Sequence, residues 1–252
     1  MPVLLIGCCS QKEETKINKG IAFLSEFMSI RNYSFQNTIV EGALTKAISS
    51  EERSYISVRL PIDEFPERGG ETFDLDAVKT LGDIERIVKE YGAVLEHVEG
   101  PVETDGLIPV SKAEIQTSLQ PLVQHSKQYL YSLGMSESDI SEMIAEADAD
   151  ESALIPLAAA MVESDMQYFA QAKASRFSLI PNVYALTWGD AGNCALYALG
   201  WDVAAALNRS SGRAFTKAAM KTALKAVAKR CVGYIGVAIF VVQFGACLGS
   251  RL

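Results

Sequence analysis

The sequence has 252 residues, of which 49% are hydrophobic and 21% charged, so it can enclose one or two ordinary cores and is not a disordered chain. Its 23 basic and 31 acidic residues give a net charge of −8, which argues against nucleic-acid binding by the whole chain. The charge is unevenly distributed. Residues 1–202 hold 15 basic and 31 acidic residues, a net of −16, whereas residues 203–252 hold 8 basic and no acidic residues, a net of +8.

The first residues contain a short lipidation motif. Residues 5–8, Leu-Ile-Gly-Cys, have the form of a bacterial lipobox, in which a small residue precedes the cysteine that takes lipid, so Cys8 is the predicted lipidation site. The polar residues 10–14 suit a tether that leaves a membrane. Only seven residues, with no Lys or Arg, precede Cys8, whereas a secretory signal has a basic start and about 7–15 apolar residues. We expect either that the start codon lies upstream of Met1 or, alternatively, that residues 3–6 form a buried strand followed by two cytosolic thiols.

Residues 15–110 are predicted to form a small α+β region. Apolar residues at spacings of three and four predict helices, and alternation predicts strands. The expected helices cover residues 15–31, 39–48 and 75–91, and the expected strands cover residues 54–60 and 93–98. Pro61 ends the first strand and Gly92 ends the third helix. A boundary is expected at residues 98–106, where Gly and Pro occur among acidic residues.

Residues 111–175 are predicted to form a helical block. A helix is expected at residues 112–133, with a kink or a break into two helices at Pro121. Ser136 precedes Asp139 by three residues, close to the spacing of a helix N-cap. Residues 146–151 are acidic but lack the glycine and the glutamate of a calcium loop, so they indicate a solvated helix junction. Pro156 suits the first turn of a further helix that runs to about residue 172.

The last part of the chain contains a cationic amphipathic pattern. After a linker at residues 173–182, three helices are expected at residues 191–208, 213–230 and 232–248. Lysines recur every four residues in the second helix, so the four span about 120° of one face. They are Lys217, Lys221, Lys225 and Lys229. The opposite half is apolar, and the helix holds no acidic residue to pair with them. Such a helix suits an anionic membrane surface, where each basic side chain contributes about 1 kcal/mol.

Residues 231–249 are almost entirely apolar, with Gln243 as the one clearly polar side chain. The stretch approaches the about 20 residues that span a bilayer core, and Arg230 and Arg251 flank it as interfacial charges would. We assign membrane binding to Lys217, Lys221, Lys225, Lys229, Arg230, Tyr234, Phe240 and Phe244. The alternative is that both helices belong to a soluble bundle, with the apolar helix in its core and the lysines on a solvated face.

In layout and short motifs the sequence resembles uncharacterised cell-envelope lipoproteins of the Bacteroidetes. Residues 11–14 are similar to their surface-export signal, and the C-terminal motifs look like the bacteriocin-like carboxyl ends of some such lipoproteins; these motifs are residues 188–194, 217–230, 233–238 and 244–247. The resemblance implies an anchored, outward-facing protein whose acidic body is a carrier that masks the basic segment. Proteolysis in the linker, with Arg176 as the expected cleavage site, would free residues 177–252, which carry a net charge of +6.

Three of the five cysteines, Cys194, Cys231 and Cys247, lie in the last segment. In an exported protein two of them are expected to form a disulfide, leaving one thiol. If the three helices run up, down and up, Cys194 and Cys231 meet at one end. Cys247 then lies a helix length away, beyond the separation of about 7 Å between Cα atoms that a disulfide tolerates. In a cytosolic protein all three would be small buried side chains.

No catalytic signature is recognised in the sequence. His97 and His125 belong to no zinc-binding motif or nucleophile elbow, and no glycine-rich phosphate loop occurs. We therefore expect a protein that is not an enzyme and uses no metal or cofactor.

The sequence predicts a mainly helical fold with a small α+β N-terminal region and a three-helix C-terminal unit, divided into residues 1–14, 15–110, 111–175 and 176–252. We expect a lipoprotein of the bacterial outer membrane or cell surface whose C-terminal segment acts on the lipid bilayer, as a bacteriocin-like antimicrobial that a processing protease releases and that is then secreted. We expect no nucleic-acid or small-molecule partner. One alternative is a structural or partner-binding lipoprotein with the C-terminal helices as core, and a weaker one is a hydrolase with an unrecognised site.

Overall fold

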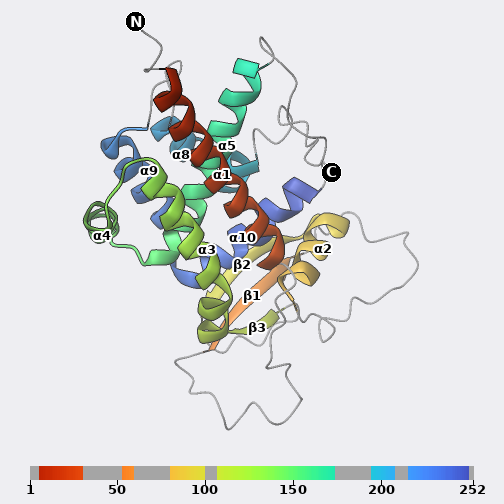
Figure 1. Cartoon of the computed structure of the whole chain (residues 1–252). Coiled ribbons are helices and arrows are strands. Elements are labelled where there is room, and N and C mark those ends of the chain that lie inside the picture. The colour runs from red at the N-terminus through yellow and green to blue at the C-terminus, as the bar shows by residue number, and fades with distance from the viewer. Residues whose placement is uncertain are drawn as a thin grey trace, which may run out of the picture.

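Helices form most of the described chain, as the sequence predicts (Figure 1). The computed structural model describes residues 6–30, 53–59, 80–99, 107–173, 194–207 and 215–249. In chain order the helices are α1 (Ile6–Ile30), α2 (Leu81–Tyr91), α3 (Lys112–Ser132), α4 (Glu137–Glu146), a 3-10 turn η3 (Glu151–Ala153), α5 (Leu154–Lys173), α7 (Cys194–Leu199), α8 (Trp201–Ala206), α9 (Lys217–Arg230) and α10 (Gly233–Gly249). The helix expected at residues 39–48 and the linker beyond residue 173 lie outside the described residues.

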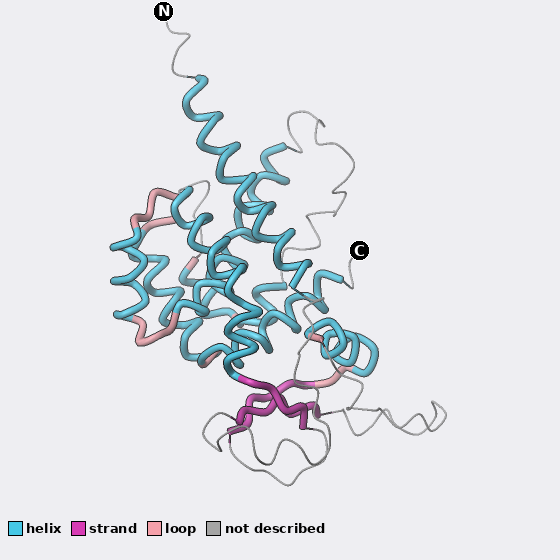
Figure 2. The backbone as a smooth tube through the Cα atoms, turned by 60° about the horizontal axis from the view of Figure 1, so that its bottom comes forward, coloured by secondary structure: helices cyan, strands magenta, loops and turns pink. Residues whose placement is uncertain are grey.

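Three antiparallel strands form a small sheet at one end of the helical body (Figure 2). The central strand β1 (Arg53–Arg59) pairs with β2 (Val94–Glu99) on one side and with β3 (Leu107–Ser111) on the other. Strands β1 and β2 confirm the two predicted strands. Strand β3 was not predicted: its five residues include Pro109, which has no amide to donate and is tolerated because β3 is an edge strand. Ile56 in β1 is fully buried, and α10 packs against β1 and β2.

Short-range contacts fix the ends of two helices. The Thr80 hydroxyl accepts a hydrogen bond from the Asp83 amide at 3.0 Å, and the Asp83 carboxylate accepts one from the Thr80 amide at 2.9 Å, which together cap the start of α2. Gly92 ends α2 with a left-handed φ of 63°, as predicted. Ser136 and Asp139 make the same pair of bonds at the start of α4, so the predicted N-cap is confirmed.

Two helices differ in their continuity from the prediction. Helix α3 continues through Pro121, so of the expected kink or break the structure excludes the break into two helices. Pro121 cannot donate to the carbonyl of Thr117, but both residues are exposed, so water can satisfy that carbonyl. Conversely, the helix expected at residues 191–208 contains a break between α7 and α8 at Gly200, which has a φ of 82°. A Cβ atom at Gly200 would lie 2.6 Å from the guanidinium Nη1 of Arg230, so the end of α9 packs directly against this break.

One hydrophobic core contains residues of most described elements, which are α1, β1, α2, β2, α3, α4, α5, α7, α8, α9 and α10. Helix α10 runs through it and contacts α2, α3, α5 and α7. The Phe244 ring lies between two others: Phe27 of α1 meets it edge to face at a centroid distance of 5.0 Å, and Phe240 stacks on it at 5.4 Å. The predicted N-terminal region, helical block and C-terminal unit therefore share one core.

Candidate functional site

The residues predicted to bind lipid fall on two consecutive helices. The basic residues lie on α9, and Tyr234, Phe240 and Phe244 lie on α10. Cys8 lies in the first turn of α1, which begins at Ile6, so the polar residues expected to form a tether are helical. Arg176, the expected cleavage site, lies outside the described residues. The candidate site is accordingly the surface of α9 and α10 and the contacts that cover it.

Helix α9 is amphipathic, as predicted, and begins at Lys217 instead of residue 213. The hydroxyl of Thr216 caps its first turn by accepting a hydrogen bond from the Ala219 amide at 3.1 Å. Its buried residues are separated by three, one and three positions, which places them on one face of the helix. They are Met220, Ala223, Leu224 and Val227. Because this apolar face already packs in the core, only the lysine face of α9 remains toward the surface.

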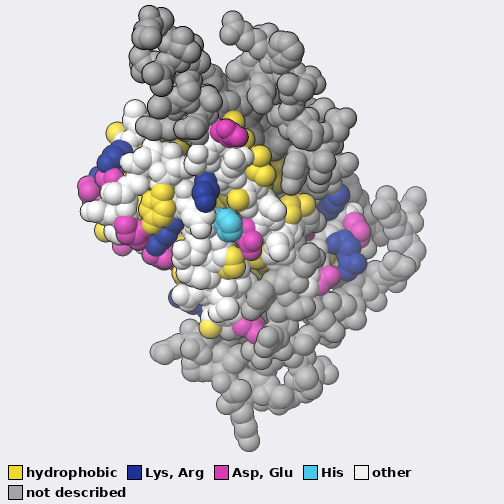
Figure 3. Space-filling model, in the orientation of Figure 1, with side chains coloured by type: hydrophobic (Ala, Val, Ile, Leu, Met, Phe, Trp, Pro, Cys, Tyr) yellow, Lys and Arg dark blue, Asp and Glu magenta, His cyan; other side chains and the backbone are white. Residues whose placement is uncertain are grey.

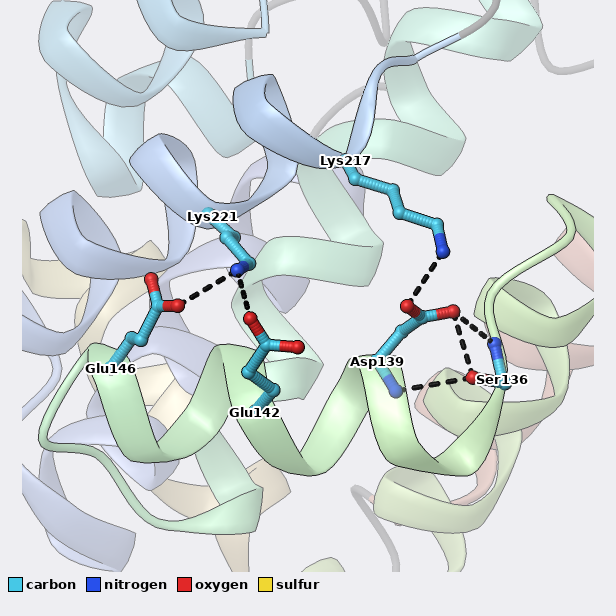
Figure 4. Close-up of polar contacts among 6 residues, drawn as sticks. All are labelled: Ser136, Asp139, Glu142, Glu146, Lys217 and Lys221. Carbon is cyan, nitrogen blue, oxygen red and sulfur yellow. Dashed lines mark hydrogen bonds and ion pairs between the residues drawn. The ribbon is translucent and has the colours of Figure 1, made fainter.

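The lysines of α9 pair with carboxylates of α4 (Figure 4). Lys217 Nζ lies 2.6 Å from Asp139 Oδ1, and Lys221 Nζ lies 2.6 Å from Glu142 Oε1 and 2.8 Å from Glu146 Oε1. Lys225 Nζ lies 3.7 Å from the second oxygen of Glu146, Oε2. These acidic residues are spaced three and four apart, so they line one face of α4 opposite a lysine stripe of spacing four. The two helices therefore meet as charge-matched surfaces, here called the α4–α9 ion-pair seam (Asp139, Glu142, Glu146, Lys217, Lys221 and Lys225).

The α4–α9 ion-pair seam shifts the acidity of its members. The hydrogen bond from Lys217, followed by those from the amide and hydroxyl of Ser136, holds the pKa of Asp139 well below its ordinary value. The Lys221 ammonium lowers the pKa of Glu146 in the same way. Glu142 and Glu146 together raise the pKa of Lys221. Acidic and basic side chains alternate on the side of the molecule where α4 and α9 lie, so the cationic stripe is not presented alone (Figure 3).

The disulfide differs from the expected one. Cys194 and Cys247 are bonded, with their Cα atoms 5.6 Å apart, and Cys231 is a buried thiol. The expectation that Cys194 meets Cys231 was wrong because residues 194–207 do not form one straight helix. The break at Gly200 lets α7 pack on α10 while α8 packs on α9, so Cys194 reaches the end of α10 instead of its beginning. Burial raises the pKa of the Cys231 thiol to about 12.

A carboxylate from α5 caps the start of α7. One oxygen of Glu163 accepts a hydrogen bond from the Cys194 amide at 2.8 Å, and the other accepts one from the Ala195 amide at 2.8 Å. A negative charge at a helix N-terminus is stabilising because the first amides there have no partner within the helix. The sequence gives no sign of this contact, since Glu163 lies more than thirty residues before the amides that it binds.

The two histidines lie apart from this seam. His97 is on β2, opposite Ile56 of the central strand. His125 is on α3, with its Nε2 atom 3.9 Å from a carboxylate oxygen of Glu26 on α1. Within the described parts of the chain, no group of three or more His, Cys, Asp or Glu side chains is placed to hold a metal ion.

Helix α10 begins at Gly233 and has 17 residues, the length expected for residues 232–248, with both ends one residue later in the chain. Over the ranges that the structure covers, no single helix has the length and apolar character needed to cross a membrane. Lys217–Arg230 and Gly233–Leu248 satisfy the length and composition criteria only as a pair, and that pair is bent by 97°. Most side chains of α10 are buried inside the protein.

No protein-family model matches this chain, and neither a curated protein nor a solved structure matches it.

Proposed function

We propose that this protein is a non-enzymatic cell-envelope lipoprotein whose C-terminal segment, residues 176–252, binds membranes and is masked by the rest of the chain. The observation that carries the proposal is the α4–α9 ion-pair seam. Three of the four lysines that would face anionic lipid headgroups, Lys217, Lys221 and Lys225, are paired with carboxylates of the body, at distances between 2.6 and 3.7 Å. In this proposal the chain is anchored at the bacterial surface through Cys8, and cleavage at Arg176 precedes release of a bacteriocin-like segment.

The unmasked segment has the chemistry that an anionic bilayer binds. Helix α9 carries four lysines and Arg230, with no acidic residue. Its other face offers Met220, Leu224 and Val227 to the acyl chains once it leaves the core. Helix α10 supplies the aromatic side chains of Phe240 and Phe244 and no charge at all. Lipid is a suitable alternative environment for both helices. Anionic headgroups can take the place of the carboxylates that bind the lysines of α9, and acyl chains can surround the apolar side chains of α9 and α10.

The disulfide supports the proposal through its position in the chain. Cys194 and Cys247 both lie C-terminal to Arg176, so their bond stays within the released segment. It closes a loop that contains α7, α8, α9 and α10. Cleavage in the linker therefore gives a cross-linked C-terminal unit and leaves no disulfide to the body among the described side chains.

The burial of α10 favours a second function. Phe240 is 2% exposed and Phe244 is 1% exposed, and both stack in the common core. A helix packed in this way also suits a structural or partner-binding surface lipoprotein in which the C-terminal helices never leave the interior. The two proposals differ in one property, which is whether residues 177–252 act on lipid when they are separated from the body.

The test is a vesicle-leakage assay with the oxidised peptide of residues 177–252. We expect dye release at micromolar peptide from vesicles that contain phosphatidylglycerol, much less release from pure phosphatidylcholine, and none with the intact chain. The matched control carries Lys217→Gln, Lys221→Gln and Lys225→Gln, which remove charge and keep the apolar face. Leakage that is equal with both lipids, or absent at micromolar peptide, would favour the second function.

The lipid anchor needs a separate measurement. Metabolic labelling with a fatty acid should attach label to the chain, and Cys8→Ala should abolish it while Cys9→Ala leaves it in place. Label that persists in Cys8→Ala would place the anchor elsewhere and remove this part of the proposal.

A further inference from the structure

We infer that the body, residues 6–173, is itself a binding partner for the C-terminal segment: it retains residues 194–249 without a covalent bond after the linker is cut, and it binds the segment of a second copy of this chain. The inference rests on one part of the proposed function, which is that the chain is cleaved in the linker. Its consequence is that cleavage alone releases nothing, and that a membrane must compete with the body for the segment.

The apolar part of this interface is a helix enclosed by the body. Helix α10 contacts α1, α2, α3, α5 and two strands, all of which belong to residues 6–173. Phe244 meets Phe27 of the body edge to face, and a Cβ atom at Gly245 would lie 2.8 Å from the buried carboxylate of Glu85 on α2. This close packing makes the site complementary to the surface of α10, because a side chain added at Gly245 would displace the Glu85 carboxylate from its buried position.

The polar part of the interface fixes the segment at two further places. The Glu163 carboxylate of α5 binds the first two amides of α7. The carboxylates of α4 bind Lys217, Lys221 and Lys225 of α9 through the α4–α9 ion-pair seam. The body thus recognises the amide end of one segment helix, the charge of a second and the apolar surface of a third.

The disulfide makes the segment a single ligand. The bond from Cys194 to Cys247 ties the start of α7 to the end of α10, so these two ends of the segment stay together even when one of them leaves the body. A cross-linked ligand also loses less conformational entropy when it binds than an open chain does. We therefore expect the two pieces to stay together at micromolar concentration.

The experiment uses the full chain with a recognition sequence for a site-specific protease inserted after Arg176, between α5 and α7. After complete cutting, the two pieces should elute together at the position of the uncut chain, and should separate only in denaturant. Separation in native buffer at micromolar concentration would overturn the inference. This experiment uses no lipid, so its result is independent of the leakage assay. A segment that does not permeabilise vesicles can still form the complex with the body.

Binding of a second copy's segment is measured by exchange. Cut complexes made from unlabelled protein are mixed with cut complexes made from isotopically heavy protein. Native mass spectrometry then measures the fraction of hybrid complexes, in which the body comes from one preparation and the C-terminal segment from the other. We expect hybrids to accumulate over hours to days, and faster in 1 M salt because salt screens the ion pairs. A complete lack of hybrids, even in mild denaturant, would refute binding between copies.

Two charge-matched variants test whether the seam is part of the interface. Lys221→Gln removes a lysine that is paired with two carboxylates, whereas Lys229→Gln removes an exposed lysine of the same helix that forms no ion pair with any described residue. We expect Lys221→Gln to speed hybrid formation about two- to fivefold and Lys229→Gln to change it less than twofold. Equal effects of the two substitutions would show that net charge, and not the seam, holds α9 to the body.

Discussion

Removal of the Cys194–Cys247 disulfide should destabilise the protein strongly. The bond closes a loop with a sequence separation of 53 residues. The chain-entropy relation for a loop of that length gives about 4 kcal/mol, because the cross-link restricts the unfolded chain far more than the folded one. For a chain of this size, each kcal/mol corresponds to about 2–4 °C in Tm, so the expected fall is roughly 8–16 °C.

The assay is urea unfolding followed by circular dichroism on three proteins: the oxidised chain, the chain with Cys194→Ala and Cys247→Ala, and the chain with Cys231→Ala. The double substitution should lower the urea midpoint and raise the slope m, since an open unfolded chain exposes more surface. Cys231→Ala removes one small buried group and should cost about 1 kcal/mol.

The comparison with Cys231 also tests the pairing. If Cys231→Ala destabilises as much as the double substitution, Cys231 is the bonded partner and the arrangement of α7 against α10 is wrong. If none of the three proteins differs by more than about 1 kcal/mol, the loop-closure reasoning itself fails for this chain.

Three further predictions concern the core, the seam and the remaining thiol. Phe244→Ala removes a ring packed between two others and should lower the free energy of unfolding in urea by about 3–5 kcal/mol. The control Val232→Ala, at a side chain that is 63% exposed, should change it by less than about 0.5 kcal/mol. Similar effects of the two substitutions would contradict the enclosure of α10. Since the pKa values of Asp139 and Glu146 are lowered on folding from ordinary values of 3.8 and 4.5, the stability from these contacts is complete above about pH 5 and is lost as the pH falls through the folded pKa values. The chain with Asp139→Asn and Glu146→Gln should accordingly lose less stability than the wild type between pH 7 and pH 3, and an equal loss would show that other groups cause the acid sensitivity. Burial raises the pKa of the Cys231 thiol to about 12, so iodoacetamide at pH 8 should label this thiol slowly in the native chain and quickly in urea. Peptide mass spectrometry measures the labelling. Rapid labelling of the native chain would show that the turn between α9 and α10 opens.

Several elements were predictable because their causes are local. The alternation that forms β1, the glycine that ends α2 and the serine that caps α4 each act within a few residues along the chain. The two faces of α9 also follow from spacing alone, and the structure buries the face that the pattern predicts. The sequence by itself therefore determined that this protein is mainly helical and that the basic residues near its C-terminus share one helix face.

The tertiary structure decided which groups meet across long distances in the chain. Lys217 and Lys221 lie 75 to 79 residues from the carboxylates that bind them. Strand β3 pairs with β1, which lies far before it in the sequence. The disulfide partner of Cys194 depends on the packing of α7 against α10, which follows the helix break at Gly200. Periodicity reports only the neighbours of a residue on its own helix or strand, whereas these contacts depend on how separate elements pack in space. That packing turns a cationic, apolar tail into a segment enclosed by its own chain.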